Sequence, residues 1–464
     1  MPRILTSREY GVKKMKTIIM AGGKGTRISS LFPDIPKPLI PITNANGESR
    51  PVLEREIMSL VSQGFFDITL TVGYLAEQII EYFGDGSKWG AKIDYFVEDT
   101  PLGNAGALFK LNLTDDFLLL NADAVFDVDF NRMVEYHFSH HALATLFTHP
   151  NSHPYDSGLI IAGDDGSVDQ WLTKEEARPP YYKNRVNAGL HVLSPKVLER
   201  VAYNIEVEKI GSGVKVDLDR QILKPLCGTR TMFCYDSPEY VKDMGTPERF
   251  EQISRDFSSG TVAAKNLSNK QKAIFLDRDG TINKYVGFLR KIDEFELLDG
   301  VAEAIKMINS SGYLCVVCTN QPVIARGEVT RGELEEIHMK METLLGIEGA
   351  YIDGLYYCPH HPHSGYEGEI KELKIECECR KPKPGLLIEA AKKYNIELSS
   401  SWMIGDGEND VKAGQNAGCK TGLIGEGSYG QDITGDSLLE IVENILLYNQ
   451  RKNQHTQTAP LAFR

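Results

Sequence analysis

The sequence predicts an α/β protein of two domains, each a mostly parallel sheet flanked by helices. Its 464 residues exceed what one ordinary core holds. Short apolar runs alternate with stretches whose apolar residues recur every three to four positions, and this alternation occurs in two separate halves of the chain. Strands that alternate with helices in this way form parallel sheets that are covered on both faces.

The first domain is predicted at residues 16–257. Its expected strands are 17–22, 68–74, 92–97 and 117–123, and its expected helices are 55–64 and 75–84. Residues 1–15 are interpreted as an N-terminal extension, because the first apolar run begins directly after Met15.

The segment 258–271 is small, polar and weakly patterned, so it is predicted to be the linker. The second domain is predicted at residues 272–447. Strands and helices are expected to alternate there through 273–280, 301–312, 313–320, 333–346, 354–361, 386–395 and 401–407. Residues 448–464 are polar and are expected to form a frayed tail.

Composition excludes several classes of protein. A net charge of −13 argues against a nucleic-acid partner, so anionic substrates must be attracted by local cations. No apolar run approaches the roughly 18–20 residues of a membrane-spanning helix, and the N-terminus is a poor signal peptide. A cytoplasmic protein with no membrane partner is therefore expected. The oligomeric state stays open, a homo-oligomer included.

Most of the eight cysteines are scattered, which is typical of a reducing compartment. Cys315 and Cys318 form a C-x-x-C, but they lie inside the apolar run YLCVVCT. A buried strand is favoured there over a redox pair, because redox motifs begin a partly exposed helix.

A glycine-rich loop follows the first predicted strand, in the sequence IIMAGGKGTR. Gly22, Gly23 and Gly25 allow backbone N–H groups to approach phosphate oxygens, and Lys24 and Arg27 add positive charge. The spacing fits neither a P-loop nor a dinucleotide fingerprint, so a simple tight turn is the alternative for the loop alone.

Three further residues favour a phosphate site. Lys37 lies between two prolines shortly after the loop. Asp123 and Asp243 each stand at the end of a predicted strand, and the carboxyl ends of strands are where open α/β sheets bind ligands. Two carboxylates there suit a complex of Mg²⁺ with a triphosphate.

The ordered motifs AGGKGTR, PKPLIPI, EDTPLGNAGAL, NADAVFDVD, NAGLHVLSP and DMGTPE resemble the sugar-1-phosphate nucleotidyltransferases, in particular their mannose- and heptose-1-phosphate guanylyltransferase branch. The resemblance covers about residues 16–250. It implies transfer of GMP from GTP by alignment and charge neutralisation, without a side-chain nucleophile. It also implies that Asp123 and Asp243 hold Mg²⁺ and that Arg27 and Lys37 act at the reacting phosphates. The implied substrate-binding residues are Ala21, Gly22, Gly23, Lys24, Gly25, Thr26, Gly103, Asn104, Lys174 and Asn187.

Two positions depart from that family's pattern. Thr173 and Lys174 stand where a Glu-Lys pair is usual, which leaves the acidic partner in doubt. Ala122 replaces the glycine that usually precedes the metal aspartate.

A second constellation begins with AIFLDRDGTIN. Asp277 and Asp279 are two positions apart after an apolar strand, so their side chains share one side, and Gly280 permits a sharp turn. A carboxylate nucleophile with a second carboxylate as acid/base is a route to phosphoryl transfer. A cation-binding turn is the alternative.

Later pieces follow in order: Thr319, Asn320 and Gln321 end a strand, Lys381 lies in CRKPKPG, and Asp406 follows SWMIG. With the D-x-D motif, they resemble the haloacid-dehalogenase-like phosphatases over about residues 272–427. The resemblance implies Asp277 as nucleophile, Asp279 as acid/base, and Thr319 and Lys381 on the phosphoryl group. It implies Mg²⁺ on Asp277, Asp406 and the backbone carbonyl of Asp279. The implied substrate contacts are residues 285–288, Asn320, Gln321 and Arg380.

A third group reads CPHHPH and, further on, CEC. Two closely spaced ligand pairs can close a tetrahedral zinc site, and three histidines are available. A phosphatase subfamily with the pattern C-x-H…C-x-C implies Cys358, His360, Cys377 and Cys379 as ligands of a structural Zn²⁺. That subfamily contains D,D-heptose 1,7-bisphosphate and histidinol-phosphate phosphatases.

Together the two resemblances imply consecutive steps of heptose activation. The second half would remove the C7 phosphate of heptose 1,7-bisphosphate, and the first would convert heptose 1-phosphate and GTP into GDP-D-glycero-D-manno-heptose. The expected partners are these small molecules, with Mg²⁺ at both sites. The alternatives are mannose 1-phosphate and histidinol phosphate as substrates, or one half serving as a non-catalytic sensor or scaffold.

Overall fold

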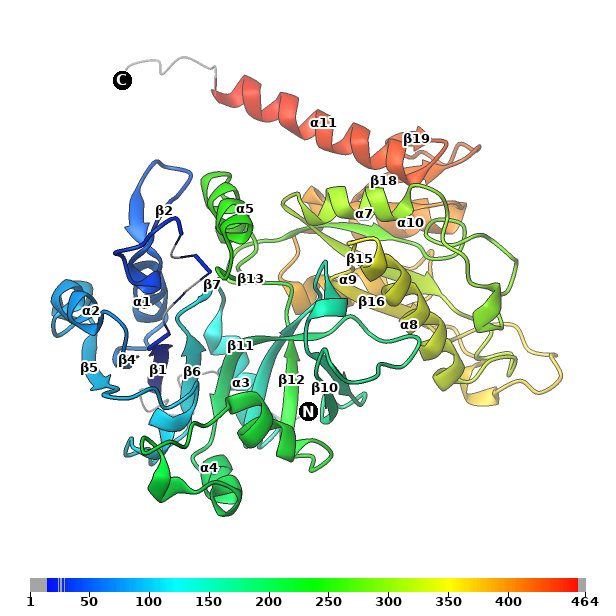
Figure 1. Cartoon of the computed structure of the whole chain (residues 1–464). Helices are drawn as coiled ribbons and strands as arrows, with labels where there is room; N and C mark the ends of the chain where they lie inside the picture. Colours follow the sequence, from blue (N-terminus) through cyan, green and yellow to red (C-terminus); the bar gives the residue numbers. More distant parts are fainter. Residues whose placement is uncertain (1–14, 24, 26, 29, 458–464) are drawn as a thin grey trace. The chain divides into compact units, whose positions relative to one another are not determined.

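The structure is a computed structural model of the chain and describes residues 15–23, 25, 27–28 and 30–457 (Figure 1). It divides into two compact units. Among the described residues, unit 1 contains 15–149, 158–175 and 185–266, and unit 2 contains 150–157, 176–184 and 267–457.

Unit 1 is built on a mixed sheet. Its strands are β1 (Lys16–Ala21), β2 (Pro41–Thr43), β3 (Ser49–Pro51), β4 (Asp67–Val72), β5 (Lys92–Val97), β6 (Phe117–Asn121), β7 (Ala124–Asp127), β8 (Ala144–His149), β9 (Leu159–Ala162), β10 (Val168–Leu172), β11 (Val186–Leu193), β12 (Met232–Asp236) and β13 (Tyr240–Asp243). Its helices are α1 (Val52–Ser62), α2 (Ala76–Phe83), α3 (Phe130–Ser139), α4 (Lys196–Val201), α5 (Pro247–Ser258) and α6 (Thr261–Ala264).

The sheet order is β10-β9-β11-β6-β1-β4-β5, with β8 paired to β11 and β12 paired to β8. The neighbours β6, β1, β4 and β5 are parallel, whereas β11 runs antiparallel to β6. Both faces are buried, because alternate residues enter different cores: Ile19 packs with α1 and α2, and Ile18 packs with α4.

Unit 2 is built on a fully parallel sheet of order β16-β15-β14-β17-β18-β19. Its strands are β14 (Lys272–Leu276), β15 (Tyr313–Asn320), β16 (Gly354–Cys358), β17 (Trp402–Gly405), β18 (Lys420–Ile424) and β19 (Ile433–Gly435). Its helices are α7 (Val301–Asn309), α8 (Arg331–Ile347), α9 (Gly385–Tyr394), α10 (Glu408–Ala417) and α11 (Leu438–Gln457). α7, α8 and α11 cover one face of this sheet, and α9 covers the other.

The prediction of an α/β fold is confirmed, and the predicted elements recur with ends shifted by a few residues. Cys315 and Cys318 are buried inside β15, as the favoured interpretation requires. Met15, assigned to the extension, is instead buried in the first core, and the rest of the extension lies outside the described residues.

The predicted linker is folded over part of its length. α6 forms within it, Asn266 Nδ2 donates to Asp127 Oδ1 at 2.6 Å in unit 1, and Gln271 N donates to Asn395 O at 3.0 Å in unit 2. The predicted tail is likewise corrected, because α11 continues to Gln457. Residues 448–457 contain no glycine or proline that would end a helix.

Unit 2 also takes two segments from the first half of the sequence, 150–157 and 176–184. Tyr182 N donates to Thr343 Oγ1 at 2.8 Å, and Asn184 N donates to Glu342 Oε2 at 2.9 Å, both on α8. The boundary predicted at 257 therefore describes the order of the halves in sequence, not the full composition of the units.

Candidate functional sites

The glycine-rich loop of unit 1 borders a cavity of about 930 Å³. Ala21 ends β1, and the loop leaves the sheet at the carboxyl ends of β1, β4 and β6, which are parallel. Of the expected residues, those lining the cavity are Ala21, Gly22, Gly23, Gly25, Arg27, Lys37, Gly103, Asn104 and Asp123. Lys24 and Thr26 lie outside the described residues. The cavity has the size of a small-molecule site.

Asp123 and Asp243 are brought together by a strand pair. β13 pairs antiparallel with β7 so that Asp243 faces Ala124, and Met244 N donates to Asp123 O at 2.9 Å. Asp123 Oδ2 lies 3.2 Å from Lys37 Nζ, and Asp243 pairs with Arg249. The Asp123 and Asp243 side chains keep 52% and 45% of their surface exposed, so both remain available to a bound cation.

Gly103 and Asn104 form one wall of this cavity. Gly103 has a φ of +86°, and a Cβ there would lie 2.3 Å from Val216 O, so only glycine fits. Asn104 Oδ1 accepts from Leu218 N at 2.7 Å, which leaves its amide NH₂ group to face a ligand.

Asn187 and Lys174 are not among the residues that line the cavity. Asn187, on β11, shares a hydrogen bond of 3.1 Å through its Oδ1 with His191 Nε2, and it also accepts from Gly189 N at 3.4 Å. His191 is fully buried, and this burial lowers the pKa of its imidazole to about 3. A neutral His191 therefore donates to Asn187 and fixes its side chain. Lys174 is exposed in the segment after β10.

Sequence reasoning missed Glu56 on α1. Its side chain is 2% exposed, and neither carboxylate oxygen has a hydrogen-bond partner. Burial and then Asp123 raise the pKa of Glu56 well above its usual value, against the opposing effect of Lys37. An acidic residue in an amphipathic helix is normally on the solvated face, so the sequence carried no signal for this buried neighbour of the site.

The nucleophile candidate of unit 2 lies in a buried ion cluster. Asp277 follows β14, and its Oδ1 lies 2.7 Å from Lys381 Nζ, which also donates to Asp410 Oδ1 at 2.5 Å. The Lys381 and Asp410 side chains are only 2% and 5% exposed. Burial opposes the charge of Lys381, but its two carboxylate partners raise its pKa above the usual value. Burial raises the pKa of Asp277 in spite of Lys381.

Asp406 completes an acidic group that could hold a metal ion. Oxygens of Asp277, Asp406 and Asp410 all lie within 4.8 Å of one another. A Cβ at Gly280 would lie 2.0 Å from Asp406 Oδ2, so glycine is required for Asp406 to reach the loop. Burial and then Asp277 raise the pKa of Asp406 to about 6. Carboxylates that raise one another's pKa at such distances are suited to sharing a divalent cation.

Polar residues at the carboxyl end of β15 form hydrogen bonds with residues of the same cluster. Asn320 Nδ2 donates to Lys381 O at 3.1 Å, and its Oδ1 accepts from Lys381 N at 3.0 Å, so this amide holds the lysine backbone. Gln321 Nε2 donates to Asp279 Oδ2 at 2.8 Å and to Thr319 Oγ1 at 3.0 Å. The side chains of Asn320 and Gln321 therefore hold Lys381 and Asp279 in place, and their contact with a phosphate stays a prediction.

Aromatic and cationic side chains surround the segment 285–288. Tyr285 and Phe288 are 67% and 40% exposed. Arg326 stacks on Phe288 at 4.1 Å and on Tyr366 at 4.2 Å from the ring centroids. Arg380 Nη1 donates to His360 O at 3.2 Å, which ties this arginine to the cysteine cluster.

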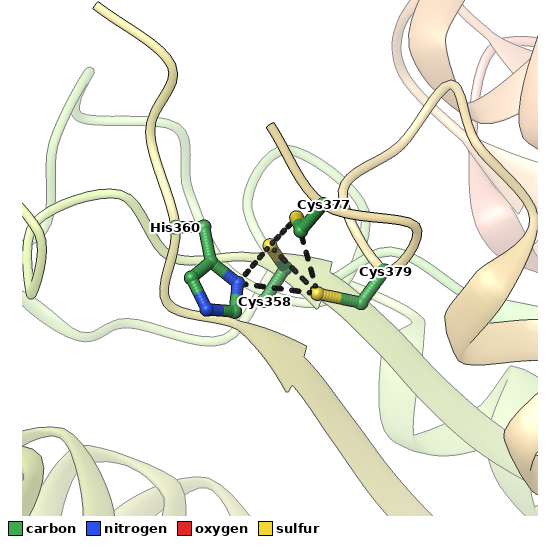
Figure 2. A group of neighbouring side chains, drawn as sticks. All are labelled: Cys358, His360, Cys377 and Cys379. Atoms are coloured by element: carbon green, nitrogen blue, oxygen red, sulfur yellow. Dashed lines mark hydrogen bonds between the residues drawn. The ribbon is translucent and has the colours of Figure 1, made fainter. Parts of the chain in front are cut away.

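Cys358, His360, Cys377 and Cys379 converge from β16 and the segment before α9 (Figure 2). Cys379 Sγ lies 3.3 Å from Cys358 Sγ and 3.3 Å from His360 Nδ1, and Cys358 Sγ lies 3.5 Å from Cys377 Sγ. A tetrahedron with Zn–S bonds of about 2.3 Å has edges of roughly 3.8 Å, so the group fits zinc with slight expansion. Neither His361 nor His363 joins the group.

Two family models match separate parts of the chain. The family model "Nucleotidyl transferase" matches residues 16–259, and the haloacid-dehalogenase-like hydrolase model matches 378–442. A D-glycero-β-D-manno-heptose-1,7-bisphosphate 7-phosphatase of Salmonella typhi is 43% identical over 158 residues, which cover 34% of this chain and 82% of that protein.

Two solved structures resemble single parts of the chain. A D,D-heptose 1,7-bisphosphate phosphatase from B. bronchiseptica, complexed with magnesium and phosphate, is 30% identical with a TM-score of 0.34, covering 38% of this chain and 99% of that one. HddC from Yersinia pseudotuberculosis is 24% identical with a TM-score of 0.42, covering 52% and 99%. Among the helices of the described residues, none has the length and apolar character that crossing a membrane requires.

Proposed function

The chain belongs to the nucleotidyl transferase family and also to the family of the D-glycero-β-D-manno-heptose-1,7-bisphosphate 7-phosphatases. From this premise we propose that it catalyses two consecutive steps in the synthesis of a nucleotide-activated heptose. The phosphatase would remove the C7 phosphate of heptose 1,7-bisphosphate. The transferase would then join the resulting heptose 1-phosphate to GMP from GTP and release pyrophosphate.

The buried cluster of Asp277, Lys381 and Asp410 carries the phosphatase proposal. Asp277 is the carboxylate at the carboxyl end of β14, the strand between β15 and β17, and Lys381 lies 2.7 Å from it. In the proposed reaction an Asp277 oxygen attacks the phosphorus, and the sugar oxygen leaves and takes a proton from Asp279. Water then attacks the aspartyl-phosphate and gives a proton to Asp279, which restores the Asp277 carboxylate and the protonated form of Asp279 and releases phosphate.

Mg²⁺ fits the acidic group of this cluster, because hard carboxylate oxygens are its preferred protein ligands. Asp277, Asp406 and the backbone carbonyl of Asp279 would hold it, where it would neutralise charge on the transferred phosphoryl group. Lys381 and Thr319 would face the same phosphoryl oxygens. The Cys358, His360, Cys377 and Cys379 group would hold a structural Zn²⁺, because four protein ligands leave no position for water.

The cavity of unit 1 supports the transferase proposal. A phosphate oxygen of the sugar 1-phosphate would attack the α-phosphorus of the triphosphate, and pyrophosphate would leave, so no side chain needs to form a bond. The backbone N–H groups of the Gly22–Gly25 loop, together with Arg27 and Lys37, would align and neutralise the phosphates. Asp123 and Asp243 would hold Mg²⁺ between them. Asn187 and Lys174 are proposed for the sugar phosphate.

The test is incubation of the whole protein with heptose 1,7-bisphosphate, Mg²⁺ and each of the four nucleoside triphosphates, followed by mass analysis. We expect phosphate, pyrophosphate and GDP-heptose, with GTP preferred. Absence of phosphate release from the bisphosphate contradicts the first step. Absence of a nucleotide sugar from supplied heptose 1-phosphate contradicts the second. Higher turnover of histidinol phosphate or mannose 1-phosphate assigns different substrates.

A further inference from the structure

Arg278, between the two aspartates of the D-x-D motif, is fully buried. Its guanidinium Nη2 lies 2.9 Å from both oxygens of Asp279 and also donates to Gln321 Oε1 at 3.1 Å. Its Nη1 lies 3.2 Å from His338 Nε2 on α8. Burial of an arginine side chain lowers the stability of the fold unless acceptors pair with its donors. The guanidinium of Arg278 has such acceptors on Asp279, Gln321 and His338.

The carboxylate of Asp279 is surrounded by donors. Oδ1 accepts from Arg278 and, at 3.0 Å, from Asn283 Nδ2, while Oδ2 accepts from Arg278 and, at 2.8 Å, from Gln321 Nε2. A carboxylate offers about four acceptor positions, and these contacts place donors on both of its oxygens. The side chain therefore has one defined orientation, which Arg278 and the amides of Asn283 and Gln321 set.

His338 fixes the other end of the guanidinium. Because Arg278 has only donors, the facing His338 Nε2 must carry a lone pair, which requires the neutral imidazole. Burial lowers the pKa of His338, consistent with this form, and its Nδ1 lies 3.9 Å from Glu335 on the solvent side. The orientation of Asp279 thus depends on a histidine in a helix remote from the D-x-D loop.

We propose that Arg278 is a positioning residue that acts through Asp279: it aims the acid/base carboxylate at the bond to the leaving group, and His338 holds Arg278 in place. This inference rests on the proposed phosphatase activity. It concerns only the proton transfers of Asp279 and not the attack by Asp277. The loss of kcat/KM in an Arg278 variant should therefore depend on the leaving group of the substrate.

An alkyl phosphate such as a sugar phosphate leaves as a strongly basic alkoxide and needs a proton from Asp279. p-Nitrophenolate is a weak base and leaves without one. The ratio kcat/KM covers the steps up to formation of the aspartyl-phosphate, so the later attack of water does not enter it. A defect in aiming Asp279 must then lower kcat/KM for the sugar phosphate far more than for p-nitrophenyl phosphate.

The experiment measures kcat/KM for both substrates in the full-length protein and in Arg278→Met, Arg278→Lys and His338→Phe. We expect Arg278→Met to lose about 10²-fold or more with the sugar phosphate and less than about fivefold with p-nitrophenyl phosphate. Arg278→Lys should recover part of the loss, and His338→Phe should show a smaller loss with the same selectivity. Asp279→Asn removes the acid/base group itself, so it should show the largest difference between the losses with the two substrates.

Thr343→Val is the matched structural control, because it removes a buried hydrogen bond on the same helix without contact to Asp279. Its losses should be equal for both substrates. Equal losses in the Arg278 variants, or none, overturn the inference while leaving the phosphatase intact. If Arg278→Met does not fold, Arg278→Lys and His338→Phe decide by the same ratio. If the unmodified protein hydrolyses neither ester, the proposed function fails first, and the inference fails with it.

Discussion

The cavity of unit 1 and the ion cluster of unit 2 both lie at the carboxyl ends of parallel strands, but they hold their charges differently. In unit 1 the Asp123 and Asp243 side chains are 52% and 45% exposed. In unit 2 the Asp277 and Lys381 side chains are 13% and 2% exposed and lie 2.7 Å apart. Both sites pair carboxylates with cations, but the pairs of unit 1 leave their carboxylates half exposed to solvent, whereas Asp277 and Lys381 of unit 2 are buried.

The difference matches the proposed chemistries. A nucleotidyl transfer needs no protein nucleophile, and the triphosphate supplies most of the charge, so an open site with separate ligands suffices. An aspartyl-phosphate requires a carboxylate whose position and charge are fixed before attack, and buried partners fix both. Substitutions should therefore affect the two sites to different extents, and each prediction below tests one side of this contrast.

The largest effect is expected from Asp277→Asn. It removes the proposed nucleophile, so phosphate release should fall by about 10⁴-fold or more, whereas pyrophosphate release from a supplied sugar 1-phosphate should stay within about threefold. Coupled assays for phosphate and pyrophosphate measure both. The exposed Asp299→Asn serves as control and should change neither. Loss of both activities in a folded Asp277→Asn protein would refute the independence of the two sites.

The next effect tests the open site. Asp123→Ala and Asp243→Ala each remove one proposed Mg²⁺ ligand, so pyrophosphate release should fall by about 10²- to 10³-fold while phosphate release continues. Raising the Mg²⁺ concentration should recover part of the rate, because the remaining carboxylate is exposed. Asp94→Ala, a surface carboxylate paired with Lys92 on β5, is the control. Near-normal transfer in both variants would show that the cation binds elsewhere.

Much of both sites could be predicted from sequence, because their residues directly follow apolar strands. Asp123 and Asp277 come after the runs that form β6 and β14, so their places at the sheet edge followed from strand periodicity. The cysteine cluster could also be predicted from the sequence, because the short spacing within each pair of ligands, C-x-H and C-x-C, is typical of zinc sites. His360 was selected from three histidines by resemblance, and the geometry places it in the group.

What could not be predicted depends on contacts between distant residues. The segment 176–184 belongs to unit 2 because Tyr182 meets Thr343, 161 positions away. Glu56 and Arg278 are charged residues that tertiary packing buries, and no local pattern distinguishes them from surface charges. The helical continuation of α11 beyond residue 447 has another cause: this segment is polar, but it contains no helix breaker, so the helix extends to Gln457.

A third prediction concerns the cysteine cluster and the zinc ion proposed for it. Purified protein should contain about one zinc per chain, and Cys377→Ser should lose it, since a structural site needs all four ligands. Unfolding of unit 2 should then begin at a lower temperature. His361→Gln and His363→Gln are matched controls that should keep the metal. Zinc retained in Cys377→Ser, or lost in either control, would contradict the ligand assignment.

The smallest effect concerns a buried group of unit 1 that stays neutral. His191 has a pKa of about 3 in the folded protein, because burial disfavours its charged form, against 6.5 in the unfolded chain. The unfolded state therefore binds the proton more readily, so the stability that a neutral His191 preserves is complete above pH 6.5 and is lost as pH falls toward 3. Between pH 7 and pH 5 the loss should be about 2 kcal/mol.

Hydrogen exchange of β11 amides, corrected for the intrinsic effect of pH, measures this change in the unit that contains His191. In His191→Gln the group that titrates is gone, so the stability difference between pH 7 and pH 5 should shrink by about 2 kcal/mol even if the variant is less stable at both. The exposed His363→Gln controls for loss of a histidine as such. An unchanged pH dependence in His191→Gln would mean that the imidazole becomes protonated within the fold. The donor that fixes Asn187 would then carry a charge near the proposed sugar-phosphate site, and the contrast between an open site on a neutral scaffold and a buried site built from paired ions would no longer hold.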